Sequence, residues 1–77
     1  MRVIFKKFDT GEIIAFFPDN PWDQVGNLTS YIHEGQHGAA SQALFDELEL
    51  ATKKEYMPLL SELKNLVGYK NLIICKK

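Results

Sequence analysis

The chain has 77 residues, of which 45% are hydrophobic and 25% are charged, and its formal net charge is −1. This length predicts one domain spanning residues 1–77, and the hydrophobic content argues against an intrinsically disordered chain. Acidic and basic residues are mixed along the sequence rather than gathered in a basic stripe, so binding to nucleic acid is not expected.

The first two elements are predicted to form a β-hairpin. The segments "RVIFKKF" (2–8) and "EIIAFFP" (12–18) are rich in β-branched and aromatic residues, and "DTG" joins them. Gly11 supplies the positive φ angle that such a turn needs. Pro18 is expected to end the second strand, because proline has no N–H to donate to a ladder.

A loop and a third strand are predicted next. Residues 19–27 contain Asp, Asn, Pro and Gly and indicate a loop, in which Trp22 is expected to cover one end of the core. Residues 28–34, "LTSYIHE", favour a strand that ends near Gly35. Residues 35–41, "GQHGAAS", then predict a turn, with Ser41 as the N-cap of a short helix over 42–49.

The longer helix has the clearest local signal. Thr52 and Glu55 have the spacing of a capping box, and apolar residues recur at helical spacing from Tyr56 to Val67. Pro58 is expected on the polar side of this helix, together with Glu62. Gly68 predicts a left-handed C-cap.

The final strand, residues 72–75, is apolar on both sides and is predicted to lie inside the sheet. The expected fold is therefore a two-layer α+β domain with the order β-β-β-α-α-β. It has a mostly antiparallel sheet of three or four strands, with both helices on one face.

Residues 33–37 spell the metalloprotease pattern H-E-x-x-H. On a helix, His33 and His37 would share one face and could bind zinc, with Glu34 as general base. Gly35 and Gly38 disfavour a helix here, and in a strand the two histidines would be about 13 Å apart. The chain has no third histidine to complete the site. We therefore predict no catalytic residue and no metal site, and keep a zinc hydrolase through His33 and His37 as a remote alternative.

The same stretch supports a second hypothesis, which is a small-ligand or anion site. Free N–H groups at a helix N-terminus and glycines that permit close approach can hold a phosphate or carboxylate. The candidate residues are Gly35, Gln36, His37, Gly38 and Ser41. The alternative is that the glycines simply form the turn.

The "GQHGAAS" segment carries a resemblance, together with "FKKFDTGEIIAFFP" before it and "ATKKEYMPLLSELKNLVGYKNL" after it. These stretches resemble a group of short uncharacterised proteins encoded in bacterial genomes and their mobile elements. The resemblance covers nearly the whole chain. It implies no activity and assigns no functional residue.

The expected function is that of a small non-enzymatic interaction module, which binds a protein partner or a second copy of itself and needs no cofactor. The single cysteine, Cys75, cannot form an internal disulfide and favours a reducing compartment, the cytoplasm. The longest apolar run, residues 13–17, is too short to span a bilayer, so no membrane association is expected.

Overall fold

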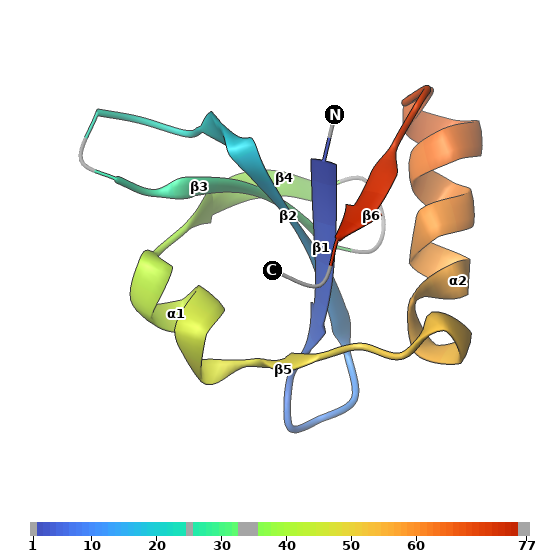
Figure 1. The fold of residues 1–77 in the computed structure, drawn as a ribbon, viewed down its shortest axis with the longest axis horizontal. Coiled ribbons are helices and arrows are strands. Elements are labelled where there is room, and N and C mark those ends of the chain that lie inside the picture. The colour runs from blue at the N-terminus through green and yellow to red at the C-terminus, as the bar shows by residue number, and fades with distance from the viewer. Residues whose placement is uncertain (1, 25, 33–35, 76–77) are drawn as a thin grey trace.

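The computed structural model describes residues 2–24, 26–32 and 36–75. Its elements form a small α+β domain (Figure 1). In chain order they are β1 (Arg2–Lys7), β2 (Ile13–Pro21), β3 (Leu28–Ile32), β4 (Gln36–Ala40), α1 (Gln42–Glu47), β5 (Glu49–Leu50), α2 (Lys53–Glu62), its π-helical continuation η1 (Leu63–Val67) and β6 (Ile73–Cys75). Within these ranges, no helix combines the length and apolar character that crossing a bilayer requires.

The predicted β1–β2 hairpin is confirmed. The two strands pair antiparallel, and Gly11 turns the chain at φ 93°, with its N–H donating to the Phe8 carbonyl at 2.9 Å. The prediction that Pro18 ends the second strand is wrong, since β2 continues to Pro21. The ladder with β3 shifts its register between Phe17 and Pro21, and this irregularity accommodates the prolines.

The sheet has the order β4-β3-β2-β1-β5, with antiparallel neighbours throughout, and β6 adds a parallel pairing to β1. It therefore has more strands than the three or four predicted. Because β2 occupies one side of β1, the short strands β5 and β6 share the other side. The predicted interior position of the last strand is wrong, because β6 lies at the edge and Ile73 is 59% exposed.

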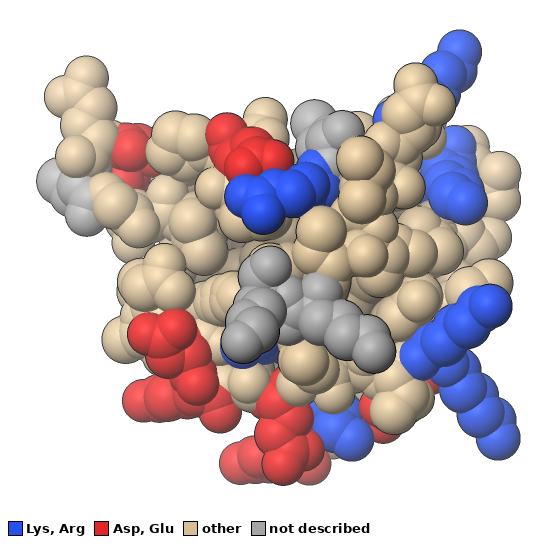
Figure 2. Space-filling view, in the orientation of Figure 1, with Lys and Arg blue, Asp and Glu red and all other residues tan. Residues whose placement is uncertain are grey.

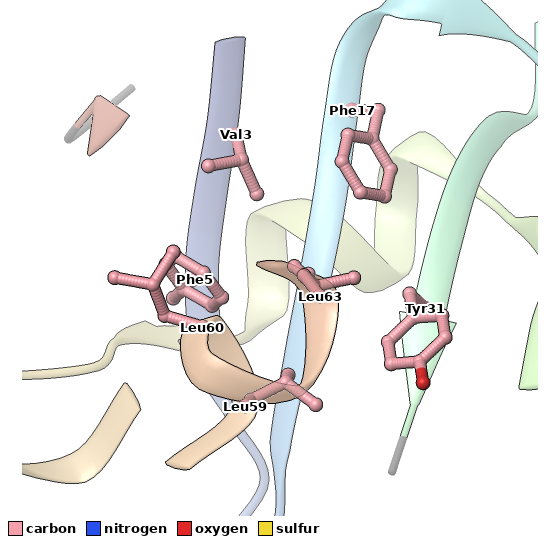
Figure 3. Packing of buried hydrophobic residues seen from close by; sticks show 8 residues of the cluster. Val3, Phe5, Phe17, Tyr31, Leu59, Leu60 and Leu63 are labelled. Carbon is pink, nitrogen blue, oxygen red and sulfur yellow. The ribbon is translucent and has the colours of Figure 1, made fainter. Parts of the chain in front are cut away.

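The helices lie on opposite faces of the sheet, which corrects the prediction that both cover one face (Figure 1). Alternate residues of β1 enter different hydrophobic clusters: Val3 and Phe5 pack toward α2, whereas Ile4 packs toward α1. Figure 3 shows the α2 side of the sheet, with strand residues facing the helix. A helix on each side is needed because β1 and β2 are buried on both faces.

The residues of each cluster come from several elements. The α2 cluster consists of Val3, Phe5, Ala15, Phe17, Tyr31, Leu59, Leu60 and Leu63, and the α1 cluster of Ile4, Ile14, Phe16, Ala40 and Phe45. The side chains of Leu66 and Val67, which we predicted for the α2 stripe, lie outside the described set. Trp22 is 49% exposed and belongs to neither cluster, so the prediction that it covers the core is wrong.

The helix ends follow the local sequence signals. Ser41 caps α1 by accepting the Leu44 N–H, and Thr52 and Glu55 form both hydrogen bonds of the capping box. Gly68 adopts φ 90° after η1, and its N–H donates to the Leu63 carbonyl at 3.0 Å. Pro58 is exposed, as predicted, but Glu62 is buried rather than on the polar side.

Candidate functional site

The described residues between Tyr31 and Ser41 are not helical. β3 ends at Ile32 and β4 begins at Gln36, and the two strands pair antiparallel. His37 therefore lies in a strand and not in a helix. His33, Glu34 and Gly35 lie outside the described residues. Within the part that is described, no group of three His, Cys, Asp or Glu side chains is placed to hold a metal ion.

His37 lies on the α2 side of β4, directly opposite Tyr31 on β3. The two rings meet edge to face with their centroids 4.8 Å apart. The His37 Nε2 is 3.0 Å from the hydroxyl of Tyr69, which follows η1 in the chain. These contacts join the β4 edge to the end of the long helical segment, although the His37 ring itself remains exposed.

Tyr31 also makes a buried hydrogen bond. Its hydroxyl donates to Glu62 Oε1 at 2.9 Å, and the two residues are 1% and 8% exposed. Tyr31, His37, Glu62 and Tyr69 form a cluster that we call the tyrosine–histidine cluster. It connects the neighbouring strands β3 and β4 with α2 and with the segment that follows η1, and its bonds hold these parts together. Glu62 was missed because its partner is 31 residues away in the chain, and helical spacing predicted that it would lie on the polar side of α2.

The predicted turn over residues 35–41 is wrong for residues 36–40, which form β4. Gly38 has an extended backbone, and its carbonyl accepts a hydrogen bond from Ser30 Oγ at 3.0 Å. The Ser41 hydroxyl is occupied by the Leu44 N–H at 3.1 Å. Around Gly38, the turn that motivated an anion site is thus replaced by a strand. Binding of a ligand by Gly35, Gln36, His37, Gly38 and Ser41 stays a prediction.

Among the described strands, β4 is the terminal strand of the sheet, and its outer edge, the side away from β3, is open to another molecule. The inner side of β4 pairs with β3 in an unbroken register from Leu28↔Ala40 to Ile32↔Gln36. No other strand in the described ranges pairs with its outer side. Ala39 is exposed there, whereas Ala40 is buried in the α1 cluster. The five residues include no Asp, Glu, Lys, Arg or Pro.

The opposite side of the sheet is built differently. Within the described ranges, its outermost strands, β5 and β6, have two and three residues, and β5 carries Glu49. Short strands and charged residues are common means of protecting a sheet edge from another chain. The β4 edge has neither, so among the described strands it is the better template for strand addition.

Comparison of the chain with protein-family models, with curated proteins and with solved structures found no significant match. The resemblance to short bacterial and mobile-element proteins therefore stays a prediction.

Proposed function

We propose that this chain is a small, non-enzymatic protein-interaction module that binds an extended protein segment along the β4 edge. The observation that carries the proposal is the unprotected character of β4, a five-residue edge strand with a regular ladder and no charged residue or proline. An added strand would obtain its affinity from backbone hydrogen bonds and its specificity from alternating side chains.

The surroundings of β4 support a binding role. On the α2 side, the exposed His37 side chain belongs to β4 itself and would lie next to an added strand, and its Nε2 is held 3.0 Å from the Tyr69 hydroxyl. On the other side, Phe45 of α1 packs with Ala40 and supports the end of β4. Because the inner ladder and both faces hold β4 in place, little ordering of the edge would be required when a partner binds.

A second exposed apolar surface competes with this one. Ile73 and Ile74 of β6 are 59% and 40% exposed. They are consecutive in a strand, so their side chains point to opposite faces and do not form one continuous patch. Charges on the face drawn in Figure 2 are of both signs and form no single basic surface. These features favour β4 as the binding edge and a protein segment as its ligand.

The test is a selection of binders from a random peptide library, with amide NMR used to locate the bound peptide. Ala39→Lys places a charge on the exposed edge, and Ala43→Lys is the matched control on the exposed surface of α1. We expect selected peptides to shift the amides of residues 36–40, to lose binding to Ala39→Lys and to keep binding to Ala43→Lys. Peptides that shift β6 amides instead, or that bind Ala39→Lys equally well, would contradict the proposal.

A further inference from the structure

We infer that the partner at the β4 edge is the β4 strand of a second copy, paired antiparallel about a twofold axis through Gly38. This inference rests on the proposed function and specifies its ligand. A twofold interface requires a surface that is complementary to itself, so the sequence of β4 can be examined directly for that property.

The sequence of β4 is complementary to itself in one register. When Gly38 lies opposite the Gly38 of the other copy, His37 lies opposite Ala39, and Gln36 lies opposite Ala40. Each larger polar residue then meets a small one, and no two like charges are opposed. Both strands use all five residues in this arrangement.

Neighbouring registers are less suitable. Centring the pair on His37 places the two imidazoles directly opposite each other and leaves Ala39 and Ala40 of both strands without a partner in β4. Centring it on Ala39 moves His37 opposite Ser41, which lies beyond β4 and caps α1. The register through Gly38 therefore retains the largest ladder and leaves the cap of α1 in place.

Gly38 gives a second, independent argument. Its φ angle is not positive, and a Cβ atom built there would meet no described atom within 4 Å. Neither the backbone conformation nor packing in the described chain requires glycine at this position. Glycine inside a strand lowers its stability, and it often marks a place where another backbone approaches closely. Gly38 is the middle residue of β4, where the twofold axis would pass.

The test is sedimentation velocity of the purified chain over a wide concentration range. We expect a dimer in the wild-type protein and in Ala43→Lys. Ala39→Lys should weaken the dimer by at least about tenfold, because each change occurs twice at a twofold interface. Gly38→Val is a second variant, since valine favours strands and should preserve the folded monomer while crowding the axis. Circular dichroism reports whether each variant is folded.

A cross-link tests the register. In a Cys75→Ser background, a mixture of His37→Cys and Ala39→Cys chains should form a disulfide-linked heterodimer on oxidation, whereas Ala43→Cys chains should not cross-link. Residues 37 and 39 lie opposite each other in this register, with Cα atoms about 5.5 Å apart. A wild-type chain that stays monomeric at all concentrations would overturn the inference, as would a dimer that Ala39→Lys leaves unchanged. Peptides that still bind β4 in those cases would leave the proposed function standing.

Discussion

Lys6 and Lys7, adjacent residues of β1, hold helices on opposite faces of the sheet. Lys6 Nζ donates to the Phe45 carbonyl of α1 at 2.7 Å and lies 3.9 Å from the centroid of the Phe45 ring. Lys7 Nζ pairs with Glu55 of α2 at 3.0 Å. Because side chains alternate along a strand, this basic pair positions both helices rather than forming a binding surface for phosphate.

Lys6→Met should remove the contacts between the Lys6 ammonium and Phe45 at the end of α1. The methionine side chain is also unbranched, so it keeps the apolar part of the lysine side chain. We expect a loss of about 1–2 kcal/mol, since a hydrogen bond and a cation–π contact are removed together. Urea unfolding measures the loss, and hydrogen exchange should show faster exchange over α1 with α2 unchanged. Lys53→Met, at the exposed start of α2, is the control. An equal loss in both variants would argue against a specific role for Lys6.

The two tyrosines of the tyrosine–histidine cluster should respond differently to the same substitution. Tyr31→Phe removes a buried hydrogen bond to a carboxylate, and we expect it to cost about 1.5–3 kcal/mol. Tyr69→Phe removes an exposed bond to His37 and should cost less than about 1 kcal/mol. Denaturant unfolding of both proteins gives the comparison. A Tyr69→Phe variant that is the less stable of the two would show that the cluster depends on its exposed half.

The features that the sequence predicted correctly depend on neighbouring residues. The capping box of Thr52 and Glu55, the Ser41 cap and the Gly11 turn each involve residues three or four positions apart. Their geometry is set locally, so it can be inferred without knowledge of the rest of the fold.

The wrong predictions concern pairing across the chain. β4 contains Gly38, Ala39 and Ala40, which have low strand propensity, and it is a strand because β3 supplies its ladder. The continuous apolar runs in β1 and β2 are typical of strands buried on both faces, but we applied this pattern only to the last strand and therefore missed the helix on each side of the sheet. The same pattern was misleading for β6, where Ile73 and Ile74 are exposed at the sheet edge.

Gly38 and Gly68 should differ when each is replaced by alanine. Gly38→Ala fits the extended backbone and open surroundings, and we expect the folded monomer to gain about 0.4–1 kcal/mol from lower entropy of the unfolded chain. Gly68→Ala must hold an alanine at φ 90° and should lose about 1–2 kcal/mol. Unfolding is compared at one low protein concentration, so that self-association does not contribute. A destabilised Gly38→Ala monomer would remove the argument that folding does not require glycine there.

Glu55 should make stability dependent on pH in the acid range. Hydrogen bonds from the Thr52 backbone, and then from Lys7, lower the pKa of its carboxyl from 4.5 to about 2. A lowered pKa in the folded state stabilises the protein above pH 4.5, and this contribution is lost as the pH falls toward 2. Glu55→Gln keeps a side chain that can accept the Thr52 N–H but removes the charge.

The stability difference between wild type and Glu55→Gln should therefore be largest above pH 4.5 and should shrink toward pH 2. Thermal unfolding across this range measures it. Glu47→Gln, on the exposed surface of α1 and on the other face of the sheet, is the matched control. If the stability difference between wild type and Glu47→Gln depended on pH in the same way, the effect would reflect the overall charge of the protein rather than the contacts of Glu55. A difference that stays constant with pH would show that Lys7 and Thr52 do not favour the charged form of Glu55.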